Sequence, residues 1–210
     1  MALLWIIIGA VFDFFDGMSA RLLHVSSPIG KELDSLADDV TFGVAPSTIV
    51  FSQLFVMEYP AILEPLRSWL PYTAFIIAAF SALRLAKFNL DERQTTSFIG
   101  VPTPANALFF VALGWMDAKT GFNQGGWVLL MVPAMSWLLI SPVRMFAFKF
   151  QSFAFKGNEI RYIFIALAVV LLVALGIPAV PIVILLYIAI SAVGWGMSLK
   201  KPGSAACPEK

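Results

Sequence analysis

Charged residues, cysteine and long polar segments are all scarce in this sequence. Only 13% of its 210 residues are charged, whereas 60% are hydrophobic, and the mean hydropathy is +0.86. These values lie outside the range of soluble globular domains and indicate an integral membrane protein. No polar segment is long enough to fold as a separate aqueous domain. We therefore expect one all-α membrane domain over residues 1–200, followed by a polar cytoplasmic tail over 201–210.

Two of these shortages exclude further classes of protein. The single cysteine, Cys207, lies in the polar tail, so the chain can form no internal disulfide. The formal net charge is only +1, which provides no basic surplus for a nucleic-acid partner. The expected surroundings are membrane lipids.

Apolar segments of about 20 residues, bounded by proline, glycine and charged residues, predict the transmembrane helices. The segment Gly176-Ile177-Pro178 could be a tight hairpin between two spans or a kink in one long helix. With a hairpin the sequence predicts a polytopic bundle of about seven spans. These are expected near 2–23, 32–56, 69–90, 103–117, 126–141, 160–175 and 177–198.

The distribution of lysine and arginine predicts the orientation of this bundle. Twelve of these residues fall on one side of the membrane, and only Arg67 and Lys119 fall on the other. Such an excess marks the cytoplasmic side. A single span over 160–198 would move Lys200 and Lys201 to the wrong side, so the hairpin is preferred. The twelve residues are Arg21, Lys31, Arg84, Lys87, Arg93, Arg144, Lys149, Lys156, Arg161, Lys200, Lys201 and Lys210.

Four aspartates interrupt the first two apolar spans near their predicted cytoplasmic ends. Asp13 and Asp16 are three residues apart in the first span, and Asp34 and Asp38 are four apart in the second. Each pair therefore lies on one helix face, and two antiparallel helices can bring all four carboxylates into one layer. Because four like charges repel at that depth, some must be protonated or a cation must hold them. All-oxygen ligands favour Mg²⁺ or Mn²⁺.

The residues between these acids indicate what else the layer binds. Gly17, Ala20 and Gly30 are small and would let a bulky group approach the backbone. Arg21, beside metal-bound carboxylates, is typical of a phosphate clamp. The implied ligand is anionic, carries phosphate and is reached from the cytoplasmic leaflet.

Three more charged residues lie near this layer. Asp39 points about 100° away from Asp38 on a helix, which indicates a supporting or interfacial residue rather than a ligand. Arg84 and Lys87 could both be anchors at the membrane surface. Arg84 lies three residues deeper, and an arginine inside a span usually faces a partner or a cavity, so it is the better candidate for function.

The acids and the small residues together resemble the complete signature of the CDP-alcohol phosphatidyltransferases. The resemblance implies that the four aspartates hold one or two divalent ions against a pyrophosphate and that the small residues and Arg21 shape the CDP-lipid pocket. It also implies a homodimer. Asp38 would accept the proton of the acceptor hydroxyl; alternatively it is a ligand only, because a metal-bound carboxylate is a weak base. The eight signature positions are Asp13, Asp16, Gly17, Ala20, Arg21, Gly30, Asp34 and Asp38.

Other stretches are similar to the serine-specific bacterial members of this family, the phosphatidylserine synthases. They are "GKELDSLADDVTFGVAP" (30–46), "ALRLAKFN" (82–89), "FIGVPTPA" (98–105) and, more weakly, "SPVRMFAFK" (141–149). The resemblance implies CDP-diacylglycerol and L-serine as substrates, phosphatidylserine and CMP as products, and a bacterial inner membrane with the site facing the cytoplasm. Arg84, within the second stretch, would bind the serine carboxylate.

The resemblance has one departure and leaves two alternatives. Members of the family normally have one more transmembrane helix before the first aspartate, whereas only 12 residues precede Asp13, so we expect the chain to lack that helix. A sibling enzyme would use glycerol 3-phosphate or inositol phosphate as acceptor. A cation-coupled transporter would need polar groups across the membrane, but the outward halves of the first two spans carry no ionisable residue.

Overall fold

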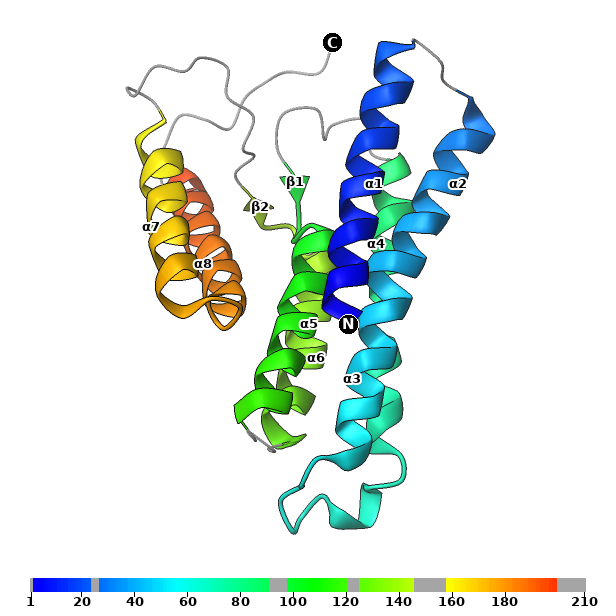
Figure 1. The fold of residues 1–210 in the computed structure, drawn as a ribbon, viewed down its shortest axis with the longest axis vertical. Coiled ribbons are helices and arrows are strands. Elements are labelled where there is room, and N and C mark those ends of the chain that lie inside the picture. Colours follow the sequence, from blue (N-terminus) through cyan, green and yellow to red (C-terminus); the bar gives the residue numbers. More distant parts are fainter. Residues whose placement is uncertain (1, 24–26, 91–97, 121–124, 146–157, 200–210) are drawn as a thin grey trace.

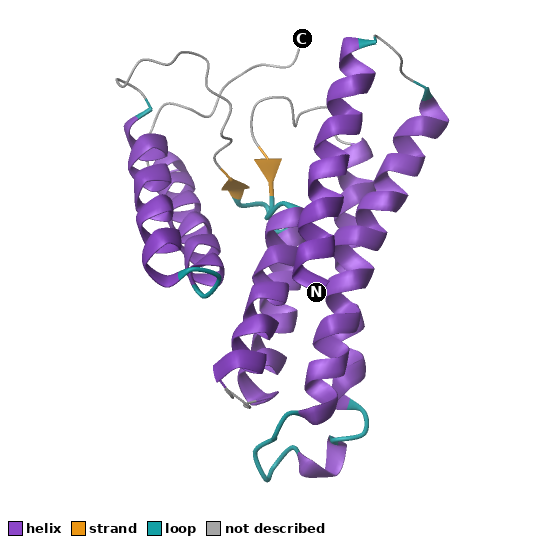
Figure 2. Cartoon of the chain, viewed as in Figure 1, coloured by secondary structure: helices purple, strands orange, loops and turns teal. Residues whose placement is uncertain are grey.

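The computed structural model describes residues 2–23, 27–90, 98–120, 125–145 and 158–199. Most of these residues are helical, and Figures 1 and 2 show the long helices running roughly side by side. The predicted all-α helix bundle is confirmed. The long helices are α1 (Ala2–Leu22), α2 (Pro28–Asp39), α3 (Ala45–Val56), α4 (Ile76–Leu90), α5 (Thr103–Thr120), α6 (Gly125–Ile140), α7 (Glu159–Leu175) and α8 (Ala179–Leu199).

The second predicted span is one continuous helix that contains an irregularity. It runs through α2, the π-helix η1 (Val40–Val44) and α3, and it begins at Pro28 rather than near residue 32. The earlier start has a local cause, because the Ser27 hydroxyl caps the helix by accepting a hydrogen bond of 3.0 Å from the Gly30 amide. Pro28 suits the first turn, because proline has no N–H and the amides of the first turn have no partner within the helix.

Four helical segments are long and apolar enough to cross a membrane. In the described part of the chain, three further helices have shorter apolar stretches, Thr103–Met116, Gly125–Ile140 and Ile160–Leu175. The expected seven helices are therefore present, but only four of them have an apolar stretch of the spanning length of about 18 to 20 residues. That the three helices with shorter apolar stretches also cross the membrane therefore stays a prediction. The four long segments are Ala2–Ser19, Pro28–Val56, Leu70–Leu90 and Ala179–Gly196, the third of which joins the 3-10 helix η3 (Leu70–Phe75) to α4.

The last two helices form the predicted hairpin rather than one kinked helix. The helix α7 ends at Gly176, whose φ of 68° lies in the left-handed region that favours glycine. The chain then reverses, and α8 packs against α7, as Figure 1 shows in yellow and orange. Because α8 also contacts α5, the hairpin is joined to the rest of the bundle.

Two connections meet at one end of the bundle, which the sequence did not predict. The strands β1 (Phe98–Ile99), after α4, and β2 (Arg144–Met145), after α6, form a short antiparallel pair. Next to it, Gly100 has a φ of 77°, and a Cβ there would stand 2.2 Å from the Leu139 carbonyl oxygen. Only glycine fits this contact, which holds the start of α5 against the end of α6.

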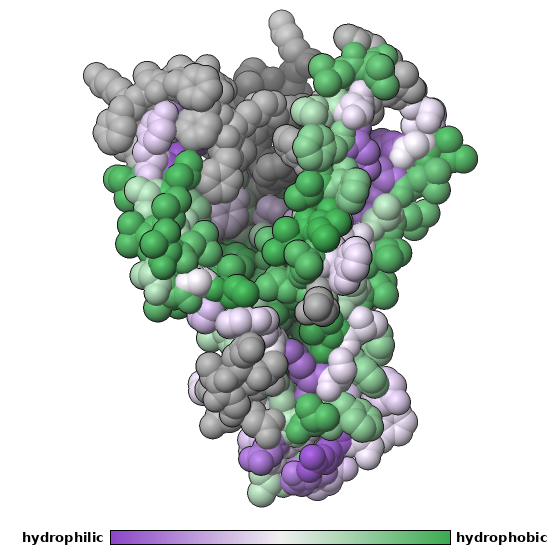
Figure 3. All heavy atoms as spheres, in the orientation of Figure 1, coloured by the Kyte–Doolittle hydropathy of each residue, from purple (hydrophilic) through white to green (hydrophobic). Residues whose placement is uncertain are grey.

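The hydrophobic core has a large and a small part. The large part lies among α3, α4, α5, α6 and α8, where Leu54 and Phe110 are fully buried. In the small part, Ile6 packs α1 against Phe42 of η1. Apolar side chains also cover much of the surface of α1 and of the hairpin in Figure 3, as expected for helices that face lipid.

Another short helical element lies between α3 and α4, at the opposite end from β1 and β2. It is the 3-10 helix η2 (Glu64–Leu66), within a mostly exposed connection.

The pairing of β1 with β2 agrees with the predicted topology of the bundle. The two strands lie in connections that the charge distribution places on the same side of the membrane.

Candidate active site

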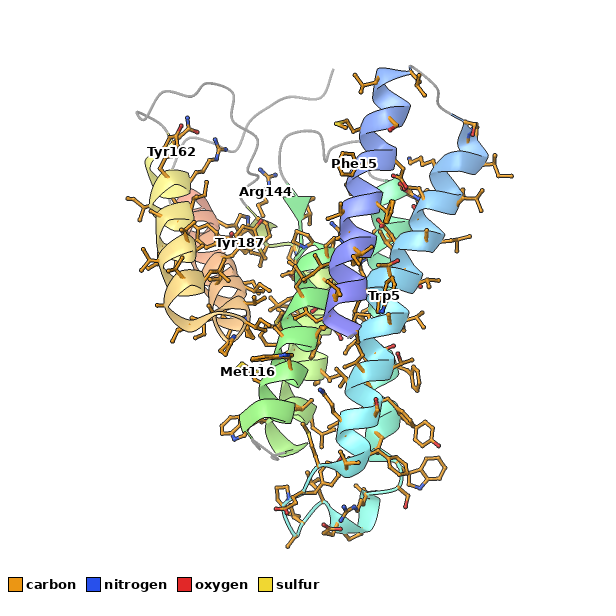
Figure 4. The ribbon with its side chains drawn as sticks, viewed as in Figure 1. Trp5, Phe15, Met116, Arg144, Tyr162 and Tyr187 are labelled. Carbon is orange, nitrogen blue, oxygen red and sulfur yellow. The ribbon has the colours of Figure 1, made fainter. Side chains whose placement is uncertain are left out.

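The first two spans bring their aspartates together. Asp13 and Asp16 on α1 and Asp34 on α2 each offer a carboxylate oxygen, and these three oxygens lie within 4.8 Å of one another. Spacings of three and four residues place them on facing sides of the two helices. Phe15, between the first two aspartates in sequence, marks the level of the cluster on α1 in Figure 4.

Asp38 completes the cluster one helical turn further along α2. Its carboxyl group is in hydrogen-bonding contact with that of Asp13 and lies close to that of Asp34. Asp38 is half-buried, whereas Asp34 is exposed. The four acids therefore form one group that extends from the surface into the space between the helices.

The cluster has the donor set that a hard divalent cation requires. An Mg²⁺ ion lies about 2.0–2.1 Å from its oxygen ligands, so two ligands of one ion are up to about 4.2 Å apart. The three carboxylate oxygens within 4.8 Å of one another need only small side-chain rotations to reach that separation. An all-carboxylate site of this kind fits Mg²⁺ or Mn²⁺ better than a soft metal.

The small signature residues differ in what surrounds them. A Cβ at Gly17 would have no atom within 4 Å, so the helix surface there is open beside the acids. At Gly30 a Cβ would stand 2.9 Å from the Ser27 hydroxyl, so its small size makes room for the helix cap. Ala20 and Arg21 lie in the last turns of α1, and their side chains are outside the described part of the structure.

Arg84 of α4 is buried beside the cluster. Only 8% of the residue is exposed, and its Nη1 donates a hydrogen bond of 3.2 Å to the hydroxyl of Thr103, the first residue of α5. Its guanidinium lies 5.5 Å from the centre of the Phe88 ring and interacts electrostatically with Asp38. This geometry does not fit an anchor at the membrane surface, because the charged group faces the interior.

A polar clamp that sequence reasoning missed holds α2 against α4. The Lys31 ammonium donates to the Asn89 carbonyl oxygen at 3.2 Å, and the Asn89 amide donates to the Ser35 hydroxyl at 2.8 Å. Asn89 belongs to the same "ALRLAKFN" stretch as Arg84, but nothing in its spacing points to α2. The clamp holds the helix that carries Asp34 against the helix that carries Arg84.

Asp39 is directed away from the cluster of four aspartates, as the helical geometry predicts. One of its carboxylate oxygens, Oδ1, is buried and has no hydrogen-bond partner. That oxygen lies 2.5 Å from the position that a Gly43 Cβ would occupy, and the Cβ of Ser81 lies 2.9 Å from the same point. Asp39 therefore points along η1 toward α4.

The comparisons with known proteins agree with this site. The family described as CDP-alcohol phosphatidyltransferase matches residues 1–140, which include both aspartate pairs and Arg84. A Bacillus subtilis protein named CDP-diacylglycerol–serine O-phosphatidyltransferase is 36% identical over 151 residues, covering 70% of this chain and 76% of the relative. A Helicobacter pylori protein of the same name is 33% identical over 172 residues, covering 79% and 69%. The chain thus belongs to the CDP-alcohol phosphatidyltransferase family.

Proposed function

We propose that this protein is a phosphatidylserine synthase, which transfers the phosphatidyl group of CDP-diacylglycerol to the hydroxyl of L-serine and releases CMP. The observation that carries the choice of acceptor is that relatives similar over most of the chain are named for this reaction. The convergence of the four aspartates at the signature positions supports the reaction type. Family membership gives the transporter alternative no support.

The aspartates carry the first part of the mechanism. Asp13, Asp16 and Asp34 would hold Mg²⁺ or Mn²⁺, together with Asp38. When bound, one or two such ions supply positive charge that stabilises the pyrophosphate oxygens during displacement. The carboxylates fix where the pyrophosphate can lie, so that the serine oxygen can approach opposite the leaving group.

Asp38 has the position expected of a proton acceptor. It is half-buried, whereas Asp16 and Asp34 are exposed, and it lies close to Arg84. In the reaction the serine oxygen forms a bond to the diacylglycerol-bearing phosphorus, and the bond from that phosphorus to the oxygen of CMP breaks. The serine hydroxyl proton passes to Asp38, and CMP leaves with the bonding electron pair.

The two substrates would occupy different sides of the cluster. The open helix surface at Gly17 leaves room for the CDP group, which Ala20, Arg21 and Gly30 would help to bind. Arg84 would bind the serine carboxylate, since a guanidinium can make two parallel hydrogen bonds to it. Its burial beside Asp38 supports this role.

The charge distribution and the family resemblance support a proposal about the setting of the enzyme. The apolar helices indicate a membrane protein. We further propose that residues 1–200 form the membrane domain and 201–210 a polar tail, that the protein lies in a bacterial inner membrane with the aspartates facing the cytoplasm, and that it forms a homodimer. The tail lies outside the described residues.

One assay tests the proposal. Purified protein receives CDP-diacylglycerol with Mg²⁺ or Mn²⁺, and CMP release is compared across serine, glycerol 3-phosphate, inositol and inositol phosphate. We expect serine to give the highest rate and to yield phosphatidylserine. A higher rate with a phosphate-bearing acceptor would instead identify a sibling enzyme.

A further inference from the structure

Serine carries three groups that need partners in its binding site. The proposed function assigns its hydroxyl to Asp38 and its carboxylate to Arg84, but it assigns nothing to the α-ammonium group. Transferring an ammonium group from water into a helix bundle is costly unless an anionic acceptor is present. A further carboxylate should therefore lie close to Asp38 and Arg84 without ligating the metal.

Asp39 meets this requirement. Its Oδ1 is buried and has no hydrogen-bond partner, a state that is unfavourable for a carboxylate in a low-dielectric site. The oxygen reaches toward α4 because Gly43, one turn further along, has no side chain in its path. Asp39 thus presents an unpaired carboxylate oxygen on the side of α2 that faces α4, away from the aspartate cluster.

The facing side of α4 provides the complementary groups. Ser81 and Arg84 are three residues apart, on one face of the helix. Ser81 is fully buried, and its hydroxyl has no partner in the structure. Arg84, more than nine-tenths buried, uses Nη1 for Thr103, while its Nε has no partner. Two unpaired buried groups on α4 therefore lie on the face that the Asp39 oxygen approaches.

This arrangement is complementary in charge to an α-amino acid, because an anionic and a cationic side chain lie close together. Asp39 lies near Ser81, and Arg84 lies one turn nearer the aspartate cluster, where it interacts with Asp38. The ammonium and carboxylate of serine are attached to one carbon atom, so their partners must be a few ångströms apart. Ser81, which lies beside Asp39, and Arg84 are three residues apart, a rise of about 4.5 Å along α4, which is a suitable separation.

We propose that Asp39 binds the α-ammonium group of serine, so that Asp39 and Arg84 together form a subsite for the zwitterion next to Asp38. This inference rests on the proposed function. It assigns to Asp39 a role in choosing the acceptor: the subsite rejects acceptors that carry a phosphate in place of the ammonium group, because Asp39 repels the additional negative charge.

The test compares serine with an acceptor that lacks only the ammonium group, 3-hydroxypropanoate. Full-length protein is assayed for CMP release with each acceptor, and where turnover of the analogue is slow its inhibition constant against serine replaces the KM. The variant is Asp39→Asn, which keeps the shape and removes the charge. The matched control is Glu32→Gln, which removes one charge from an exposed site on the same helix.

We expect Asp39→Asn to raise the KM for serine about tenfold or more, since one charge-assisted contact is lost. The KM for CDP-diacylglycerol and the constant for 3-hydroxypropanoate should not change, and Glu32→Gln should behave as the wild type. A normal KM for serine in Asp39→Asn would overturn the inference. So would an equal loss with both acceptors, because that result indicates a structural role for Asp39.

A second variant and the wild-type assay keep the test decisive. If Asp39→Asn does not fold, Asp39→Ser removes the same charge with a smaller polar side chain and should show the same selective loss. Failure of the wild type to use serine, together with turnover of another acceptor, would overturn the proposed function itself. A wild type that uses serine alongside an Asp39 variant with unchanged kinetics would overturn only the zwitterion subsite.

Discussion

The guanidinium of Arg84 donates a hydrogen bond of 3.2 Å to the hydroxyl of Thr103, and this bond joins two segments of the chain at the candidate active site. Arg84 lies in the middle of α4, and Thr103 is the first residue of α5. The bond helps to keep a buried positive charge beside Asp38 rather than at the membrane surface. In the proposed function, an arginine held in this way would be oriented before the serine carboxylate binds.

The aspartate cluster leads to the first prediction. Asp34→Asn keeps the side-chain shape and removes one metal-binding charge, so CMP release should fall on the order of a hundredfold or more. The measurement is the initial rate at saturating substrates over a range of Mg²⁺ and Mn²⁺ concentrations. Glu32→Gln on the same helix should keep the normal rate. A well-folded Asp34→Asn protein with near-normal activity would contradict the role of the cluster.

Arg84 carries the second prediction. Arg84→Lys keeps a positive charge but cannot reproduce two parallel hydrogen bonds to a carboxylate. The KM for serine should therefore rise far more than the KM for CDP-diacylglycerol. Steady-state kinetics with each substrate varied in turn provide the measurement. Equal damage to both substrates would indicate that Arg84 supports the aspartates electrostatically and does not bind serine.

Thr103 carries the third prediction, because its hydroxyl orients Arg84. Thr103→Val has nearly the same shape but removes the hydrogen-bond acceptor, and a bond to a charged group is worth enough to raise the KM for serine roughly tenfold. The exposed Thr48, whose hydroxyl donates to the Ala45 carbonyl oxygen in its own helix, provides the matched control as Thr48→Val. An unchanged KM in Thr103→Val would show that Arg84 is held by other contacts.

Two glycines give a paired prediction about stability. Gly100 and Gly176 both have positive φ values, but a Cβ would contact the Leu139 carbonyl oxygen only at the first. Gly176→Ala should cost about 1 kcal/mol from its backbone conformation alone, and Gly100→Ala should cost at least twice as much. Thermal unfolding of the detergent-solubilised protein measures the difference. Equal losses would mean that the contact between α5 and α6 relaxes readily.

The orientation of the bundle can be tested with single cysteines in a Cys207→Ser background. Ala61, in the exposed connection before α4, should lie outside, and Arg144, in β2, should lie in the cytoplasm. An impermeant thiol reagent applied to intact cells should label Ala61→Cys and leave Arg144→Cys unlabelled. The reverse pattern would place the aspartate cluster on the outer face of the membrane.

The sequence by itself determined the class of protein, the positions of the helices and the identity of the cluster. An apolar composition of 60% requires a membrane bundle, because such a chain cannot cover its surface with polar groups. The spacing of Asp13 and Asp16, and of Asp34 and Asp38, determines which helix face each pair occupies. Local periodicity was sufficient for these features, since every interacting residue lies within one or two adjoining helices.

Only the tertiary structure decided what surrounds the cluster. The burial of Arg84 against Thr103, the direction of Asp39 toward Ser81 and the pairing of β1 with β2 all join helices or connections that are distant in the sequence. Helical spacing predicts which residues share a face, but it does not predict which helix that face will meet. The packing of α4 between its neighbours therefore determined that the Arg84 side chain is buried beside Asp38 rather than exposed at the membrane surface.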